Sequence, residues 1–226
     1  MENSFERNEL YLKRALNSSK GSVEQKKYAK LALAEYDACE KIQIFNPGTA
    51  DAGNVEITVH FMYMRSVMMA MTDQPEETIK VTTKTLSLTD KYPDYLDFHQ
   101  IREVKSAQAE AYSELGKWEE AVKIYQGLVI EFEERGTFPD GDMIAGMCRA
   151  LYEQHEYHAA IKIGTYGTNH YRSAPGIRKY LALSQKALGN IDEANITISR
   201  AILYEQQWNK DNLEQNKQIL RELNNH

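Results

Sequence analysis

The sequence predicts an all-α protein built from repeated pairs of helices. Apolar residues recur at spacings of three and four along most of the chain, and no stretch shows the sustained alternation that is typical of a strand. Only 12 glycines and 5 prolines occur in 226 residues, which permits long helices and disfavours a turn-rich β-fold. A third observation, an internal repeat of helix pairs, shows how these helices are organised.

The clearest pair of helices spans residues 101–132. Alanine and leucine lie four apart from Ala107 to Leu115, and after a short turn a second apolar stripe runs from Val122 to Phe132. Neither helix can bury its stripe alone, so we expect the two to form an antiparallel hairpin. The same arrangement recurs over residues 143–171 and 177–205.

These hairpins are copies of one another, because four small or apolar residues recur in each with separations of three, nine and four. Small residues at the first and third positions allow two helices to approach closely. The four sets are Ser66, Met69, Thr78 and Thr82; Ala109, Tyr112, Ala121 and Tyr125; Cys148, Leu151, Ala160 and Gly164; and Ala182, Gln185, Ala194 and Ile198.

The spacing between third positions gives the length of each repeat. The last spacing is 34 residues, and the two before it are 39 and 43 residues. We place the extra residues of the longer repeats around 92–97 and 134–142, where proline, glycine and aspartate gather.

A 34-residue helix–turn–helix repeat resembles the tetratricopeptide repeat. Leu115–Val122 (LGKWEEAV) and Leu188–Asn195 (LGNIDEAN) look like its turn and second-helix opening. Residues 156–161 (EYHAAI) form a third match, with His155 where a glycine is usual, and residues 73–79 form a degenerate fourth. The resemblance implies a right-handed superhelical solenoid of antiparallel helix hairpins.

The expected organisation is a single domain over residues 1–226, because each repeat leans on its neighbours. We expect about five hairpins and a C-terminal capping helix. Residues 1–50 are interpreted as a divergent first hairpin, 55–207 as the repeats, 209–226 as the cap, and 46–54 as the clearest loop.

The resemblance also implies a site, since in this family the first helix of each hairpin lines a concave groove. The groove would begin apolar and aromatic, turn acidic and end basic, and would suit an extended segment with apolar, then basic, then acidic side chains. The alternative is that these charges form a solvated helix face. The expected groove residues are Tyr63, Val67, Glu103, Glu110, Glu114, Arg149, Tyr152, Lys179 and Lys186.

The function that the resemblance implies is a non-enzymatic adaptor that binds another protein as a peptide or helix. A peptide or small-ligand sensor whose solenoid changes pitch is the alternative, although no effector domain is visible, and an enzyme whose site forms only in three dimensions is a third. The clamp that grips chaperone C-terminal carboxylates is not expected, because Glu110 and Glu114 would repel that ligand.

Composition argues against several further partners. The formal charge of −6 and the pI near 5.6 disfavour broad nucleic-acid binding. The most apolar stretch, Ile57–Met71, is too short to span a bilayer and contains His60 and Arg65. Because the N-terminus is polar and resembles no secretory signal, we expect a cytoplasmic protein.

No cofactor, metal or catalytic motif is expected. His155 and His158 lie beside glutamates, but zinc needs three or four ligands and no third histidine or cysteine is near in sequence. Cys39 and Cys148 are interpreted as reduced thiols. The methionines between Met62 and Met71 suit either a buried core or an adaptable binding surface, and we favour the core.

Overall fold

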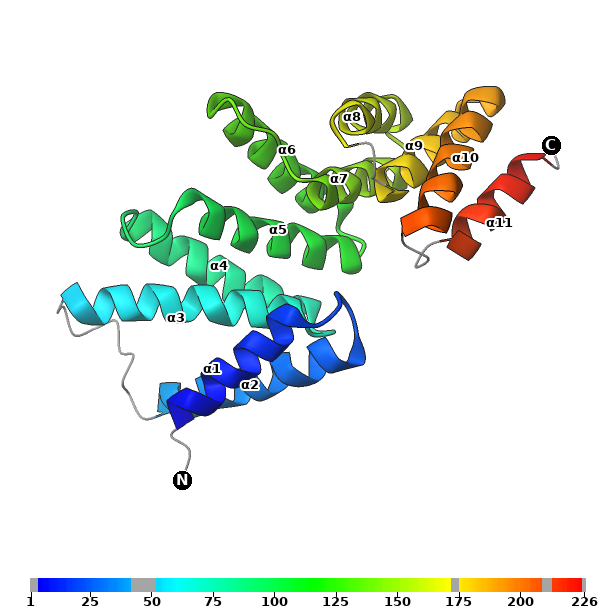
Figure 1. Ribbon diagram of the computed structural model, residues 1–226. Coiled ribbons are helices and arrows are strands. Elements are labelled where there is room, and N and C mark those ends of the chain that lie inside the picture. Colours follow the sequence, from blue (N-terminus) through cyan, green and yellow to red (C-terminus); the bar gives the residue numbers. More distant parts are fainter. Residues whose placement is uncertain (1–3, 42–51, 172–174, 209–212, 225–226) are drawn as a thin grey trace. The chain divides into compact units, whose positions relative to one another are not determined.

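The structure is a computed structural model that describes residues 4–41, 52–171, 175–208 and 213–224 (Figure 1). Within these residues it contains eleven helices and no strand. The helices are α1 (Ser4–Asn17), α2 (Val23–Lys41), α3 (Ala52–Ala70), α4 (Pro75–Lys91), α5 (Phe98–Glu114), α6 (Trp118–Glu134), α7 (Gly141–Glu153), α8 (Tyr157–His170), α9 (Pro175–Ala187), α10 (Ile191–Trp208) and α11 (Leu213–Asn224).

The chain divides into two compact units, residues 1–116 and 117–226. The division falls in the turn between α5 and α6. Each unit has its own helix packing and is described separately. The all-α prediction is confirmed for the described residues, while the number of hairpins and the single-domain organisation stay predictions.

In the first unit, neighbouring helices pack in chain order, and α3 also packs against α5 (Figure 1). A buried cluster joins α1, α2, α3 and α4, and Met62, Met68 and Met69 belong to it. Met64 and Met71 are partly buried against the same cluster. The interpretation of the methionine run as core is therefore confirmed.

The degenerate repeat on α4 has Thr78 where the other repeats have alanine, and three more threonines follow it. Thr78, Thr82, Thr85 and Thr89 are buried on one side of the helix. Their hydroxyls donate to backbone carbonyls of their own helix, so no buried hydroxyl is left without an acceptor. Small residues with satisfied hydroxyls thus keep the close packing that alanines provide elsewhere.

In the second unit, α6 to α11 pack consecutively, and α7 also packs against α9. Close approach depends on Gly167 of α8, where an added Cβ would lie 2.6 Å from Cγ2 of Ile144 on α7 and 2.8 Å from Cδ1 of Ile177 on α9. Both isoleucines are fully buried. The glycine therefore lets three helices share one layer of core.

Three turns between consecutive helices use the same backbone geometry. Gly116, His155 and Gly189 all have positive φ, of 69°, 62° and 80°. His155, which stands where a glycine is usual in the repeat, is thus a left-handed residue. The amides that follow close the helix end, for example Glu156 N donating to Leu151 O at 2.9 Å.

The extra residues of the longer repeats fall where they were expected. Residues 92–97 connect α4 to α5, and Asp97 accepts from the backbone N–H of Gln100 as a helix cap. Residues 135–140 connect α6 to α7, and Asp140 caps α7 in the same way through Met143 N.

Two boundaries differ from those predicted. Residues 52–54, assigned to a loop, begin α3, and the rest of that loop lies outside the described residues. Trp208, taken as part of the capping region, is the last residue of α10. The cap itself is α11, held to α10 by a buried hydrogen bond of 2.8 Å from Asn216 Nδ2 to Glu205 Oε2.

Candidate functional site

The predicted groove residues of the first unit lie on α3 and α5. The Tyr63 hydroxyl donates to Glu103 Oε2 at 2.5 Å, which joins the two helices. Burial, followed by this hydrogen bond, raises the pKa of Tyr63 well above its usual range. Val67 packs against the buried cluster around Met68. Both side chains therefore help to hold α3 in place.

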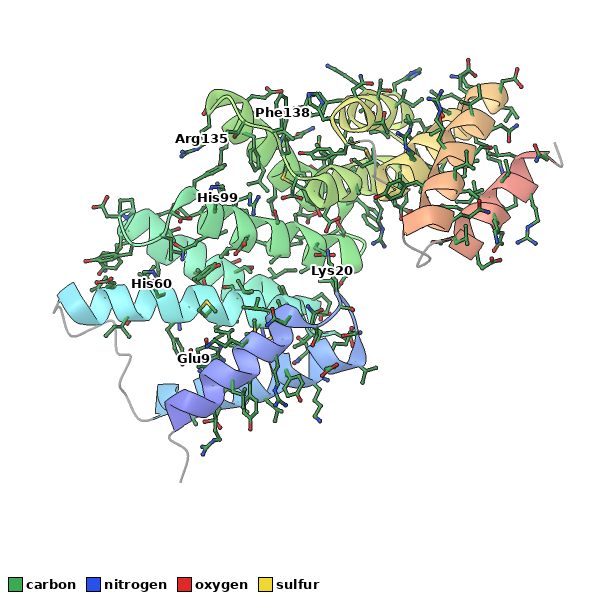
Figure 2. All side chains as sticks on the ribbon, viewed as in Figure 1. Glu9, Lys20, His60, His99, Arg135 and Phe138 are labelled. Atoms are coloured by element: carbon green, nitrogen blue, oxygen red, sulfur yellow. The ribbon has the colours of Figure 1, made fainter. Side chains whose placement is uncertain are left out.

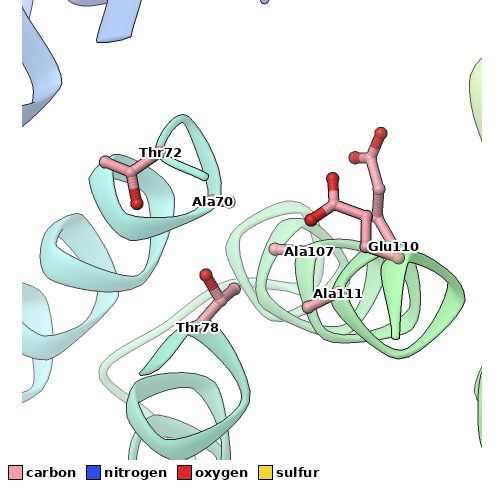
Figure 3. A pocket seen from close by; sticks show the side chains of 7 residues that line it. Ala70, Thr72, Thr78, Ala107, Glu110 and Ala111 are labelled. Atoms are coloured by element: carbon pink, nitrogen blue, oxygen red, sulfur yellow. The ribbon is translucent and has the colours of Figure 1, made fainter. Parts of the chain in front are cut away.

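Glu110 and Glu114 line a small depression in the first unit (Figure 3). Its walls are small residues of α3, α4 and α5, and Thr78 at the start of α4 faces the alanines of α5. Lys20, on the connection between α1 and α2 (Figure 2), places its Nζ 3.5 Å from Glu110 Oε1. An internal ammonium group thus already lies beside one of these two carboxylates.

In the second unit, Arg149 lies on α7 beside the start of α6. Its Cζ lies 5.4 Å from the centre of the Trp118 ring, within the range of a cation–π contact. Its Nε is buried and has no hydrogen-bond partner. The guanidinium side chain makes no ion pair with another described residue, so part of its donor capacity is unused.

Three further side chains of α7 and α9 join this arginine. The rings of Tyr152 and Tyr180 lie 6.0 Å apart, and Lys179 Nζ lies 4.9 Å from the centre of the Tyr180 ring. Lys179 makes no ion pair or side-chain hydrogen bond with another described residue. We call Trp118, Arg149, Tyr152, Lys179 and Tyr180 together the aromatic–cationic face.

Partial burial shifts the pKa values of several side chains on this face. Desolvation and the nearby Arg149 charge lower the pKa of Lys179, while Glu153 and Glu205 act in the opposite direction. Desolvation also raises the pKa of Tyr180 and of Tyr152. The two cations are therefore close enough to repel each other, and Lys179 is partly withdrawn from water.

In the second unit, three of the predicted groove residues lie on the aromatic–cationic face and the fourth does not. The structure joins Arg149, Tyr152 and Lys179 in one face, whereas Lys186 is partly buried in the last turn of α9 with no contact to them recorded. The expectation of one continuous groove from Tyr63 to Lys186 stays a prediction, because its two ends belong to different units.

The sequence argument missed Trp118 and Tyr180. Tyr180 follows Lys179 directly, and a wider face on α9 would have included it. Trp118 lies 31 positions before Arg149 and was assigned only to the repeat signature. No linear spacing predicts their contact, which requires α6 and α7 to be packed together.

A second aromatic group lies on the connection before α7, where Phe138 is 56 % exposed (Figure 2). Its ring centre lies 4.3 Å from that of His170 and 6.5 Å from that of Tyr166, both on α8. The Tyr171 hydroxyl donates to Pro139 O and so holds this connection against the end of α8. None of these residues belongs to α7 or α9, so this group is separate from the aromatic–cationic face.

The histidine pair gives no metal centre. His155 Nδ1 lies 2.6 Å from the Tyr157 hydroxyl, and no cluster of three or more candidate metal ligands occurs in the part of the chain that the structure describes. In the same residues, no helix has the length and apolar character needed to cross a membrane. That the protein uses no cofactor and is not an enzyme stays a prediction.

Comparison with known proteins bears on the fold. Neither a protein-family model nor a curated protein matches the sequence. Among solved structures, the chain is similar to a putative kinesin light chain of Podosopora anserina with nearly identical TPR-like repeats, at 13 % identity and a TM-score of 0.64 over 92 % of this chain and 98 % of that one. The chain therefore has the tetratricopeptide-like helical-repeat fold.

Two further similar structures contain bound partners. Bacillus thuringiensis PlcR, in complex with the peptide PapR7 and DNA, is 13 % identical with a TM-score of 0.60, over 97 % of this chain and 76 % of that one. The TPR2AB domain of yeast Sti1, in a complex with pHSP90, is 15 % identical with a TM-score of 0.50, over 98 % and 92 %. At these identities the similarity concerns the fold alone.

Proposed function

We propose that this chain is a non-enzymatic scaffold that binds a segment of another protein, as a peptide or helix, along the first helices of its hairpins. The observation that carries the proposal is the aromatic–cationic face on α7 and α9. Tryptophan, tyrosine and arginine are the residues most enriched among those that dominate binding energy at protein interfaces. Here they gather on one face, partly exposed, with hydrogen-bonding capacity unused.

The similar structures support this proposal at the level of the fold. PlcR is described with a peptide and Sti1 with pHSP90, and both cover nearly all of this chain. A repeat fold that holds peptides in two such different proteins is a reasonable basis for the same mode here. Fold alone does not define function, so the site residues carry the argument.

The proposed partner is a protein and not a nucleic acid, because the net charge of −6 opposes phosphate binding. A chaperone-type carboxylate clamp is not proposed. In the three clear repeats, the positions that the resemblance assigns to such a clamp mainly hold Ser106, Glu110, Ala145, Gly146 and Arg149. Lys13 and Asn17 on α1 resemble only part of a clamp.

A site-specific photo-crosslinker tests the proposal in the full chain. We expect a benzophenone amino acid at Tyr152 to crosslink to one linear segment of a partner, identified by mass spectrometry from cells that express the protein. The same group at Lys162, an exposed residue of α8, serves as the control. Crosslinks from position 152 that are no more abundant or localised than those from position 162 would contradict the proposal.

A further inference from the structure

We infer that the aromatic–cationic face selects a partner segment that carries side-chain carboxylates next to an aromatic or aliphatic residue. The inference rests on the proposed function and deepens it, because it names the chemistry of the partner. It follows from the two cations and from what surrounds them.

The first step concerns charge. Arg149 on α7 and Lys179 on α9 are near enough for the arginine charge to act on the lysine, yet neither is paired with a carboxylate of another described residue. Fully buried cations in folded proteins are ordinarily paired, and partial withdrawal of a cation from water also makes an anionic partner more favourable. An anion from outside the chain would complete this arrangement.

The second step concerns hydrogen bonds. Arg149 Nε is a buried donor without an acceptor, and a donor left unsatisfied in this way destabilises the folded protein. A carboxylate accepts from a guanidinium at two points, with a geometry that an amide or hydroxyl cannot match. A carboxylate therefore fits this donor better than a neutral group does.

The third step concerns the walls of the face. The rings of Trp118, Tyr152 and Tyr180 surround the cations with partly exposed apolar surface. Apolar surroundings strengthen a charge-assisted hydrogen bond by lowering the local dielectric. They also favour an apolar side chain beside the acid, since rings offer area for packing at low entropic cost.

Other partner chemistries fit less well. A basic segment would bring a further positive charge to two cations that already repel each other. A neutral segment could offer carbonyl or hydroxyl oxygens to the guanidinium of Arg149, but it would bring no negative charge to the two cations. Glu153, an exposed carboxylate of α7 close to this face, opposes an acidic segment, so its removal is a useful test.

The experiment uses random twelve-residue segments displayed between constant flanking residues, so that no terminal carboxylate is present, and sorts them against the full-length protein. The best binders are then synthesised with blocked termini, and each Asp or Glu is replaced by Asn or Gln. Affinity is measured by fluorescence anisotropy. We expect the selected segments to be rich in Asp and Glu, and the amide versions to bind at least tenfold more weakly.

Four protein variants locate the binding. We expect Arg149→Gln and Lys179→Gln each to weaken binding about tenfold, and Glu153→Gln to tighten it about twofold, because each changes the charge that faces the acid. Lys162→Gln removes an exposed positive charge from α8, outside the aromatic–cationic face, and should change nothing. Circular dichroism melts of all four variants identify any that fail to fold.

The outcomes separate the inference from the proposed function. Selected segments without acidic enrichment, or acidic segments that bind folded Arg149→Gln and Lys179→Gln as tightly as the unchanged protein, would overturn the inference and leave peptide binding in place. If no segment is enriched above a library sorted without the protein, peptide binding by this chain fails as well.

Discussion

Cys148 illustrates how packing controls the chemistry of one residue. Its side chain is fully buried at the first position of the repeat set, with Sγ 3.9 Å from Ala160 O. Burial raises the pKa of this thiol from its ordinary 9.0 to about 12. The thiol is therefore protonated and inert near neutral pH, as expected of a core residue.

This burial predicts the reactivity of the thiol. In a Cys39→Ser variant at pH 8, we expect the native protein to react with a disulfide reagent about a thousandfold more slowly than the urea-unfolded chain, because the thiolate fraction falls with the raised pKa. Release of the coloured thiol product measures the rate. Equal rates in the two states would show that Cys148 is accessible.

The same pKa shift links Cys148 to stability. Because the folded pKa lies above the unfolded one, the contribution of the thiol is intact below about pH 9 and is lost as pH rises from there towards 12. Above that range the unfolded and folded thiols are both ionised.

His155 shows what one residue reveals from the sequence. The repeat pattern placed His155 in the turn, where a glycine is usual, and in the structure this residue has a φ of 62°. The face around Arg149 could not be found in this way. Its key contact, to Trp118, depends on the packing of two helices and leaves no spacing signature.

At the scale of the helix, a pair of glycines with different surroundings gives a test. Gly167 of α8 faces Ile144 and Ile177 at distances too short for a Cβ, whereas Gly127 of α6 has nothing within 4 Å of an added Cβ. Both are interior helix positions. Substitution by alanine raises the helix propensity equally at both positions. The added methyl group disturbs the packing only at Gly167.

We expect Gly167→Ala to lower the free energy of unfolding by about 1–3 kcal/mol, because the core must shift to admit the methyl group. Gly127→Ala should raise it by about 0.5–1 kcal/mol. Urea denaturation followed by circular dichroism measures both. A Gly167→Ala protein as stable as Gly127→Ala would mean that α8 does not approach α7 and α9 so closely.

Helix positions were largely predictable, and the reasons for the exceptions are physical. Apolar spacing located α5 to α10 because each buries one stripe. The start of α3 was missed because Ala52–Asn54 follow a Pro- and Gly-containing stretch and resemble it in composition. The threonines of α4 weakened its signal, since their burial depends on hydroxyls satisfied within the helix.

For the whole molecule, composition predicts which partners are avoided. With 33 acidic and 27 Lys and Arg residues, we expect no binding of a 20-mer single-stranded or duplex DNA of random sequence at 150 mM salt, because too few unpaired cations are available to displace counterions. Fluorescence anisotropy of labelled DNA checks this. Micromolar binding that weakens steeply with salt would contradict it and would point to a localised basic surface.

Two glutamates in the acidic part of the predicted groove already have contacts within the first unit. Sequence spacing placed Glu103 and Glu110 on one face of α5, as the structure does. It could not show that Tyr63 and Lys20 already contact them, because those contacts join segments 40 and 90 residues apart. Arg149 and Lys179, which form no ion pair with another described residue, therefore make the stronger part of the site.

The contact between Lys20 and Glu110 affects how a basic partner could bind to the first unit. A lysine or arginine of a partner would compete with Lys20 for Glu110. Binding at this position would therefore replace one ion pair with another. The enthalpy released by the incoming pair is then largely cancelled by the pair it displaces, as is usual for exposed ions. An exposed carboxylate that already has its own counter-ion therefore adds little to the selectivity of this unit for a basic partner.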